Sequence, residues 1–250
     1  MTIKENQNLS IQTCYSPALY DLFHEDESIV VAVDILRATS AICTAFEHGV
    51  KSMIPVAGLE EAYAYKKKGF LVAAERNAVK QDGVDYGNSP LHYIDASVEG
   101  KTIVISTTNG TQAIEAAKGK ATIVIGSFLN ITALSEWLKK QNRNIIVLCA
   151  GWKNKFNMED SLFAGALSEK LLQDERFYTL CDSTIAAGYL YEQAANDLYG
   201  FLEKSSHRHR LKNLDLEDDV RFCLQQDIYS SIPILNGNEL IKLQAQPQTV

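Results

Sequence analysis

Apolar residues recur along the chain in short runs rich in β-branched side chains, and amphipathic stretches with helical spacing separate these runs. The runs have the length and composition of strands: IVVAVD (29–34), SMIPV (52–56), FLVAAE (70–75), TIVIST (102–107), ATIVIG (121–126) and IIVLCAG (145–151). The intervening helical patterns are RATSAICTAFEHG (37–49), GLEEAYAYKKKG (58–69), GTQAIEAAKG (110–119) and NITALSEWLKKQ (130–141). This alternation predicts an α/β fold, a three-layer α/β/α arrangement around a mainly parallel sheet.

The order strand, polar turn, helix, strand, helix, strand runs once over residues 29–76 and again over residues 102–152. RATSAI (37–42) in the first stretch aligns with NGTQAI (109–114) in the second. One interpretation is a duplication, with two βαβαβ halves in one domain. The other is that any two stretches of this kind resemble each other.

Residues 160–227 have a helical character, and the whole chain, 1–250, is expected to form a single domain. The predicted helices are DSLFAGALSEKLLQ (160–173), STIAAGYLYEQAANDLYGFLEKS (183–205) and LEDDVRFCLQQD (216–227), with a loop at SSHRHRLKN (205–213). Asn236-Gly237 predicts a hairpin turn before a terminal strand, ELIKLQ (239–244). The long polar stretch 76–100 contains DYGNSP (85–90), which we expect to fold over a functional site.

The composition is that of a soluble globular protein, with 250 residues, 46% hydrophobic and 22% charged. A net charge of −7 argues against nucleic-acid binding, which needs a basic face. No segment has the roughly 20 apolar residues that span a bilayer, and the amino terminus lacks a signal-peptide pattern. We therefore expect a cytoplasmic protein that acts on a small molecule, with a homodimer as the default state. The five scattered cysteines include no CxxC pair, so no disulfide framework or zinc site is indicated.

A carboxylate and a cation follow the first apolar strand of this series. Asp34 ends the strand, and Arg37, Thr39 and Ser40 lead into the next helix. Open α/β sheets bind ligands beyond the carboxyl ends of their strands, where helix amides attract anions. Asp34 beside Arg37 therefore indicates a metal ligand next to a phosphate-binding cation. The alternative is that Asp34 caps the helix and Arg37 pairs with it at the surface.

Other strand ends carry polar side chains that would meet at the same edge of the sheet. Glu75 and Arg76 follow the third strand, the turn STTNGT (106–111) follows the fourth, and Glu159 with Asp160 follows the sixth. The hydroxyls and amides of STTNGT precede a helix and are suited to an anion, although a plain helix cap is the alternative. Mg²⁺ prefers carboxylate and water oxygens, which Asp34, Glu75 and one of the last pair could supply together with a substrate phosphate.

The sequence lacks the motifs that two phosphatase mechanisms require, and it lacks one nucleotide-binding motif. An aspartyl-phosphate enzyme of the haloacid dehalogenase type needs DxDx[TV], but Leu36 stands two residues after Asp34. A cysteine phosphatase needs Cx5R, but Lys155 stands six residues after Cys149. The GxxxxGK[ST] pattern is also missing. Direct attack by a metal-activated water is therefore the preferred hypothesis.

Histidine and arginine are concentrated in SSHRHRLKN. His207 could donate a proton, and Arg210 could bind a second anionic group. The alternative is a solvated basic turn at a helix C-terminus.

Taken together, these motifs resemble the 2-phosphosulfolactate phosphatase family. The resemblance covers about residues 29 to 227 and rests on segments in the family's order: VVAVDILRATS, AAERN, DYGNSP, STTNGT, GSFLN, CAGWKNKFNMEDSLFAGAL and SSHRHRL. It implies an α/β, Mg²⁺-dependent phosphatase that converts (2R)-2-phospho-3-sulfolactate to (2R)-3-sulfolactate and phosphate, a step of coenzyme M biosynthesis. Bulky Trp152 and Lys153 stand where members of the family commonly have a small residue and glycine.

The resemblance and the residue patterns together give the expected site. The motif positions are Asp34, Arg37, Glu75, Thr108, Asn109, Gly110, Glu159, Asp160, Ser206 and His207. Asp34, Arg37 and His207 are the expected catalytic residues, and Asp34, Glu75, Glu159 and Asp160 the expected metal ligands. The expected substrate-binding residues are Arg76, Thr107, Thr108, Asn109, Gly110, Thr111, Ser206 and Arg210. The rival hypotheses are a phosphatase for another small phosphorylated carboxylate and a non-catalytic protein that binds phosphorylated metabolites.

Overall fold

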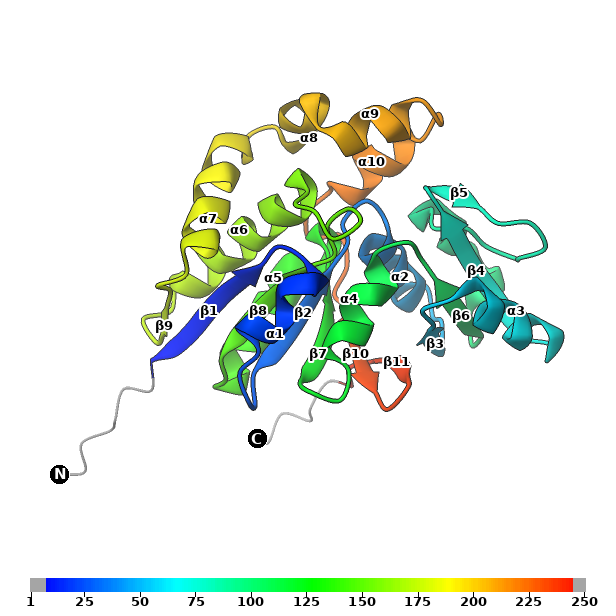
Figure 1. Ribbon diagram of the computed structural model, residues 1–250, viewed down its shortest axis with the longest axis horizontal. Helices are drawn as coiled ribbons and strands as arrows, with labels where there is room; N and C mark the ends of the chain where they lie inside the picture. Colours follow the sequence, from blue (N-terminus) through cyan, green and yellow to red (C-terminus); the bar gives the residue numbers. More distant parts are fainter. Residues whose placement is uncertain (1–7, 245–250) are drawn as a thin grey trace.

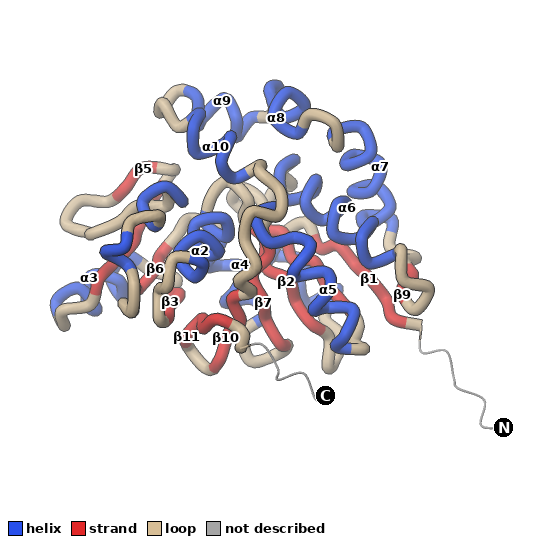
Figure 2. The backbone as a smooth tube through the Cα atoms, turned by 180° about the vertical axis from the view of Figure 1, so that it is seen from behind, coloured by secondary structure: helices blue, strands red, loops and turns tan. Residues whose placement is uncertain are grey.

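A single mixed sheet forms the centre of the molecule, with helices on both of its sides (Figure 1 and Figure 2). The computed structural model describes residues 8–244. The strands in this part of the chain are β1 (Leu9–Cys14), β2 (Ile29–Val33), β3 (Ser52–Pro55), β4 (Leu71–Arg76), β5 (Val79–Lys80), β6 (Thr102–Ser106), β7 (Thr122–Gly126), β8 (Ile145–Cys149), β9 (Phe177–Tyr178), β10 (Pro233–Asn236) and β11 (Glu239–Lys242). The α/β fold with a mainly parallel sheet is thus confirmed.

Helices follow most of the parallel strands and cover the sheet. They are α1 (Tyr20–Phe23), α2 (Ala38–Glu47), α3 (Leu59–Lys67), α4 (Gly110–Ala117), α5 (Ile131–Gln141), α6 (Met158–Leu172), α7 (Asp182–Ala194), α8 (Leu198–Phe201), α9 (Ser206–Lys212) and α10 (Glu217–Cys223). All six strands and the four helices predicted before residue 152 are present. β1 was not predicted, because LSIQTC alternates apolar and polar residues and lacks the continuous apolar run of the other strands.

Alternate side chains of β2 pack into two different cores. Val31 and Val33 contact a cluster that includes residues of α5, α6 and α7. Val30 and Ala32 contact a second cluster that includes residues of α2 and α4. All five residues of β2 are buried, as expected for a parallel strand covered on both faces. The apolar run IVVAV therefore fixes this strand in the middle of the molecule.

The strand order combines two parallel groups through an antiparallel hairpin. The order is β5-β4-β6-β3-β11-β10-β7-β2-β8-β1-β9. β10 and β11 pair with each other across the predicted Asn236-Gly237 turn, and they join β7 to β3 through antiparallel contacts. The β10–β11 hairpin therefore connects the two halves of the sheet.

The first strands of the two similar stretches are exchanged between these groups. β2 lies between β7 and β8, whereas β6 lies between β3 and β4. The order β4-β6-β3 on one side of the hairpin thus corresponds, in reverse, to β7-β2-β8 on the other. Because of this exchange, β2 and β6 each lie between two other strands. The turns that follow them therefore lie in the interior of the sheet and not at its outermost strands. A duplication of residues 29–76 and 102–152 stays a prediction, with this symmetric order as an observation that agrees with it.

The C-terminal helices α8, α9 and α10 lie together at the top of the view in Figure 1. Two predictions for this region were wrong. SSHRHRLKN is not a loop, because the Ser205 hydroxyl accepts a hydrogen bond from the Arg208 amide and begins α9. The helix predicted over 183–205 is interrupted, because Asp197 caps a new short helix by accepting from the Gly200 amide.

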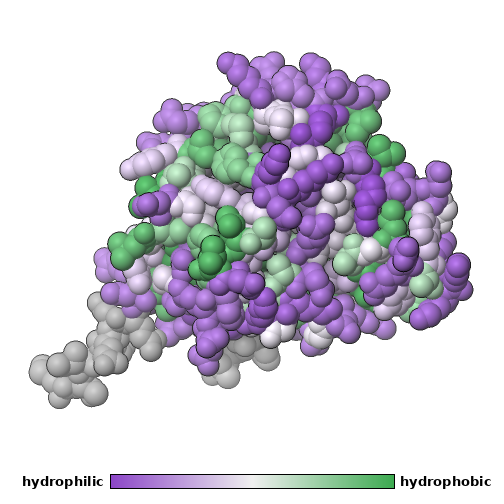
Figure 3. All heavy atoms as spheres, viewed as in Figure 1, coloured by the Kyte–Doolittle hydropathy of each residue, from purple (hydrophilic) through white to green (hydrophobic). Residues whose placement is uncertain are grey.

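The surface over α8 and α9 is largely hydrophilic in the space-filling view (Figure 3). Across residues 8–244, every helix is too short or too polar to cross a membrane.

Candidate active site

The turn after β2 holds Asp34 at the first turn of α2. Thr39 makes two hydrogen bonds with Asp34 that close the turn. Its amide donates to the Asp34 carbonyl at 2.9 Å, and its hydroxyl accepts from the Asp34 amide at 3.1 Å. The Ala38 amide donates to the Asp34 carboxylate. The Asp34 carboxylate thus contacts the first turn of α2, whose N-cap residue is Arg37, and it also lines a narrow pocket and is only 7% exposed.

The surroundings of Asp34 change its acidity. Burial raises the pKa of the Asp34 carboxyl from 3.8 to about 7. The nearby His207 opposes this rise in the pKa, whereas the carboxylates of Glu75 and Glu159 add to it. Asp34 therefore titrates near neutral pH in the metal-free protein, and a cation placed beside it would favour the ionised form.

Part of the STTNGT turn after β6 is hydrogen-bonded within itself, and another part lines the pocket. Thr107 and Thr111 bond each other: the Thr111 amide donates to the Thr107 hydroxyl at 3.1 Å, and the Thr111 hydroxyl donates to the Thr107 carbonyl. The Asn109 side-chain oxygen accepts a hydrogen bond from the Lys153 amide at 3.1 Å, and Asn109 lines the pocket. Thr107 and Thr111 thus shape the turn, and Asn109 contacts the pocket.

Gly110 is where the STTNGT turn meets the Asp34 turn. A Cβ atom on Gly110 would lie 2.6 Å from the Ala38 Cβ and 2.9 Å from Asp34 Oδ2. Those distances are too short for a side chain, so glycine is needed for the two turns to pack together. The sequence prediction that both turns face one crevice is consistent with this contact.

Glu75 and Arg76 brace the neighbouring turns from β4. The two oxygens of Glu75 accept hydrogen bonds from the Thr108 amide at 2.6 Å and the Ala78 amide at 2.7 Å. Arg76 donates to the Glu75 carbonyl and to the Ser106 hydroxyl, at 2.6 and 2.9 Å. Glu75 lines the pocket, whereas Arg76 is not among its lining residues.

Glu159 and Asp160 are adjacent on α6 but make different contacts. Asp160 accepts hydrogen bonds from the Ile35 amide at 2.9 Å, the Gly151 amide at 3.1 Å and the Asn157 side chain at 2.9 Å. Its burial, with the charges of Asp34 and Glu159, raises the pKa of this carboxyl well above 3.8. Asp160 therefore holds the backbone of two strand ends in place.

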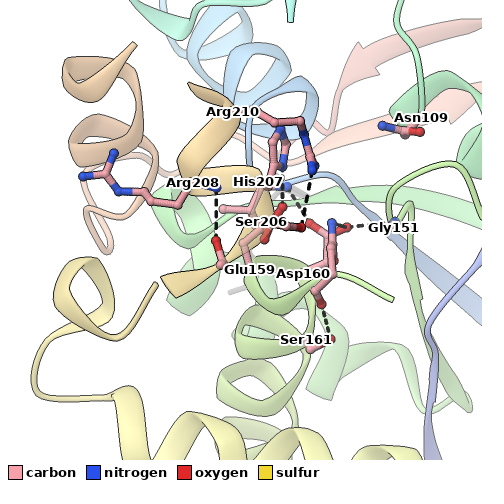
Figure 4. Close-up of polar contacts among 12 residues, drawn as sticks. Asn109, Gly151, Glu159, Asp160, Ser161, Ser206, His207, Arg208 and Arg210 are labelled. Atoms are coloured by element: carbon pink, nitrogen blue, oxygen red, sulfur yellow. Dashed lines mark hydrogen bonds and ion pairs between the residues drawn. The ribbon is translucent and has the colours of Figure 1, made fainter. Parts of the chain in front are cut away.

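Glu159 instead forms a pair with His207 across α6 and α9. Glu159 Oε1 lies 2.5 Å from His207 Nδ1, and both side chains are buried. Among the described residues, Glu159 Oε2 has no hydrogen-bond partner although it is buried. In Figure 4 Glu159 of α6 and His207 of α9 lie together, Arg208 points away from them, and Asn109 lies to one side. An unpaired buried carboxylate oxygen is a site for a cation or a proton donor.

Trp152 packs against both His207 and Arg210. The centroids of the Trp152 and His207 rings are 5.5 Å apart, and the Arg210 guanidinium lies 4.0 Å from the centre of the indole. Arg210 also donates to the Ser206 hydroxyl at 3.3 Å. Burial lowers the pKa of Arg210, and Glu159 opposes that change. The bulky residue that departs from the family pattern therefore packs directly against two expected site residues.

Arg37 does not pair with Asp34. Its guanidinium forms an ion pair with Asp219 of α10 and donates to the Ala78 carbonyl at 2.8 Å. The Ser89 hydroxyl, from the DYGNSP loop, donates to the other oxygen of Asp219 at 2.8 Å. Sequence reasoning missed Asp219, because nothing distinguishes it within the acidic run EDD at the start of a helix.

The pocket brings together residues from both halves of the sheet and from the C-terminal helices. Its lining residues are Asp34, Leu36, Arg37, Glu75, Ala78, Asn88, Asn109, Trp152 and His207. A second pocket shares Trp152 and His207 with it and is also lined by Glu159 and Ser206. Of the expected substrate-binding residues, Arg76, Thr107, Thr108, Gly110, Thr111 and Arg210 line neither pocket. Asn88 was not singled out from the sequence, although its loop was expected at the site.

Carboxylate oxygens at these two adjoining pockets suit a divalent cation held by few protein ligands. Within residues 8–244, no three His, Cys, Asp or Glu side chains are arranged so that they could hold a metal ion together. Two carboxylates do have oxygens open to a cation: Asp34 lines the pocket, and Glu159 Oε2 is buried without a partner. Mg²⁺ is commonly bound by one or two carboxylates with waters and substrate phosphate, so this donor set suits it.

Comparisons with known proteins agree with the resemblance seen in the motifs. Residues 15–238 match the protein family described as 2-phosphosulpholactate phosphatase. A probable 2-phosphosulfolactate phosphatase of Thermotoga petrophila is 42% identical over 85% of this chain and 91% of its own length. A protein with the same description from Caldanaerobacter subterraneus subsp. tengcongensis is 39% identical over 84% of this chain and 89% of its own length. The chain belongs to the 2-phosphosulfolactate phosphatase family, whose members are phosphoric monoester hydrolases.

Proposed function

We propose that this protein is an Mg²⁺-dependent phosphatase that hydrolyses 2-phosphosulfolactate to sulfolactate and phosphate. The printed descriptions of its relatives support the substrate. The observation that carries the proposal is that Asp34, Asn109 and His207 line one pocket, while Glu159, the partner of His207, lines the pocket beside it. This arrangement supplies a carboxylate for a cation, donors for an anion and an imidazole for proton transfer.

The balance of charge in the pocket supports the requirement for a cation. Asp34 and Glu75 line it with negative charge, and the positive charge of Arg37 is already matched by Asp219. A phosphate dianion would be repelled unless another cation entered with it. We assign Mg²⁺ to Asp34 and Glu159, with Glu75 and Asp160 holding the turns around them. When bound, Mg²⁺ would supply positive charge to the phosphoryl oxygens and lower the pKa of a bound water.

The protein's own groups then bind and orient the phosphoryl group. Arg37 lies on one side of the pocket, and the side chain of Asn109 lies at the start of α4, whose amide end favours an anion. Arg37 is held by two fixed partners, so it is oriented before the substrate arrives. Arg210, which stacks on Trp152 next to the pocket, is the cation we assign to the substrate's sulfonate or carboxylate group.

His207 is the group that we assign to protonation of the leaving oxygen. Glu159 binds the Nδ1 nitrogen and fixes the ring, and Trp152 packs beside it. With Nδ1 engaged, Nε2 is the nitrogen from which a proton can pass to the alkoxide that leaves phosphorus. Burial of the pair excludes bulk water from this proton.

Phosphate release from three compounds tests the proposal. Purified protein with Mg²⁺ would be incubated with 2-phosphosulfolactate, with 2-phospholactate, which lacks only the sulfonate, and with an aryl phosphate. We expect the fastest release from 2-phosphosulfolactate. Equal or faster release from 2-phospholactate would indicate another phosphorylated carboxylate as the substrate. Calorimetric binding of 2-phosphosulfolactate without any release would indicate a binding protein and contradict the proposal.

A further inference from the structure

We propose that Asp219 is a positioning residue that orients Arg37 for phosphate and anchors the loop that brings Asn88 to the pocket. This inference rests on the proposed function, because it concerns the binding of the phosphoryl group. Asp219 lies on α10, far along the chain from the strand ends that were expected to form the site. Its two carboxylate oxygens have different partners, and each partner leads to a residue that lines the pocket.

The first oxygen of Asp219 determines where the Arg37 guanidinium can lie. Asp219 Oδ2 accepts from Arg37 Nη1, and the Ala78 carbonyl accepts from Arg37 Nη2 at 2.8 Å. Arg37 is 3% exposed and Asp219 4% exposed, so water cannot replace either partner. A buried guanidinium held at two nitrogens has little freedom to rotate, which keeps its remaining N–H groups in a fixed direction.

The second oxygen of Asp219 fixes the DYGNSP loop. Asp219 Oδ1 accepts from the Ser89 hydroxyl at 2.8 Å, and Ser89 is 5% exposed. The preceding residue, Asn88, lines the pocket with 6% exposure. Among the described residues, its side-chain oxygen is buried without a hydrogen-bond partner. A buried amide oxygen without a partner at a pocket can accept a hydrogen bond from a ligand or contact a cation, and the Ser89 bond next to it sets where that oxygen points.

Loss of Asp219 would redirect Arg37 rather than simply free it. A buried guanidinium without a counter-charge is costly and moves toward the nearest carboxylate. Asp34 and Glu75 line the same pocket as Arg37 and are the carboxylates left to it. Pairing with Asp34 would turn Arg37 away from the phosphoryl group and would also occupy the carboxylate that we assign to Mg²⁺.

A role in orientation and a role in charge balance alone predict opposite results. If Asp219 only neutralised Arg37, its removal would leave an extra positive charge in the pocket and strengthen phosphate binding. If Asp219 orients Arg37 and the loop, its removal weakens phosphate binding. The affinity for inorganic phosphate, measured with Mg²⁺ and without turnover, separates these two roles.

The experiment compares three variants of the full chain by calorimetry with inorganic phosphate and by steady-state kinetics with 2-phosphosulfolactate. For Asp219→Asn we expect phosphate Kd and substrate KM to rise about tenfold or more, because a charge-assisted contact is lost. For Ser89→Ala, which keeps the Arg37 pair, we expect a rise of about threefold from one lost hydrogen bond. Asp218→Asn, an exposed neighbour on the same helix, should change neither value.

Two controls keep the outcomes distinct. Circular dichroism checks each fold, and if Asp219→Asn does not fold, Ser89→Ala carries the test. Unchanged or tighter phosphate binding in the folded Asp219→Asn variant, or in Ser89→Ala when it alone is testable, would overturn the inference. Wild-type protein that binds phosphate but releases none from the phosphoester would instead refute the proposed function, while the calorimetric comparison would still decide the role of Asp219.

Discussion

Glu159 contacts His207 through one carboxylate oxygen, at 2.5 Å, while its other oxygen is buried and has no hydrogen-bond partner within residues 8–244. One side chain thus contacts the candidate proton donor and presents an open oxygen to a cation. The pair joins α6 to α9, two helices that the chain reaches only after completing most of the sheet. The C-terminal helices therefore complete the site that the strand ends begin.

Replacement of Glu159 by glutamine should weaken both its contact with His207 and the binding of a cation. Glu159→Gln keeps the shape but removes the negative charge, so we expect kcat to fall by about 100-fold or more and the Mg²⁺ concentration for half-maximal rate to rise. Steady-state kinetics across a range of Mg²⁺ concentrations measures both effects. Glu169→Gln on the exposed side of the same helix is the matched control. An unchanged Mg²⁺ requirement in Glu159→Gln would show that Glu159 is not a metal ligand.

The role of His207 predicts a dependence on the leaving group. His207→Gln should lower kcat for 2-phosphosulfolactate by about 100- to 1000-fold, because the alkoxide then leaves without a proton. An aryl phosphate has a leaving group that needs no proton, so its rate should fall by only about tenfold or less. The measurement is the ratio of the rate with 2-phosphosulfolactate to the rate with the aryl phosphate, compared between wild-type protein and His207→Gln. An equal loss for both substrates would indicate that His207 binds or orients rather than donates a proton.

The sequence predicted the strands of the sheet better than their arrangement. IVVAV and TIVIS are continuous apolar runs, and such runs mark strands buried on both faces. The exchange of β2 and β6 between the two halves could not be predicted, because it depends on which strands pair across the sheet and both arrangements bury the same apolar residues. The two errors in the C-terminal region depend on local caps, at Ser205 and Asp197, within a polar sequence.

The placement of a residue at the pocket was predictable where it follows from position at a strand end, as for Asp34 and Asn109. It was not predictable where it depends on the direction of a side chain. Glu159 and Asp160 are neighbours, but successive residues on a helix point about 100° apart, so Glu159 contacts His207 and Asp160 accepts from backbone amides. The contact between Arg37 and Asp219 joins residues 182 positions apart, and no local pattern signals it.

The raised pKa of Asp34 predicts that this residue destabilises the metal-free protein at neutral and higher pH. Folding favours its protonated form, so the contribution to stability is fully present below pH 3.8 and is lost as the pH rises through about 7. Asp34→Asn cannot ionise, and at pH 8 in EDTA it should therefore unfold at a temperature several degrees higher than wild type, with a gain of about 2–4 kcal/mol.

The same unfolding measurement tests the link between Asp34 and Mg²⁺. Near pH 4 the unfolding temperatures of Asp34→Asn and wild type should differ only slightly. Added Mg²⁺ at pH 8 should stabilise wild type and leave the variant unchanged. A variant that is less stable than wild type at every pH would contradict a raised pKa, and equal stabilisation of both proteins by Mg²⁺ would contradict Asp34 as a ligand.

Gly110→Ala tests the contact between the two turns. The added Cβ would lie within 2.6 Å of the Ala38 Cβ and 2.9 Å of Asp34 Oδ2, so the turns must separate. We expect a loss of stability of about 1–3 kcal/mol, and about a tenfold or greater fall in kcat from displacement of Asp34. Gly188→Ala in α7 is the control, because no atom of the described residues, apart from its chain neighbours and its own helix backbone, lies within 4 Å of the added Cβ. It should leave the activity unchanged and raise stability by about 0.5–1 kcal/mol.

A full rate for Gly110→Ala would show that the close packing of the two turns is not needed for catalysis. Thermal unfolding and kcat should be measured on the same preparation of each glycine variant, so that a loss of activity can be separated from a loss of fold.

The most direct test of the central claim is the rate of phosphate release from 2-phosphosulfolactate in the presence of Mg²⁺, measured side by side for wild-type protein and Asp34→Asn. The wild type should release phosphate in proportion to protein and time, and the folded variant should release at least about 100-fold less. No release by wild-type protein with intact fold and Mg²⁺ present, or an equal rate for the two proteins, would contradict the assignment of phosphatase activity to this pocket.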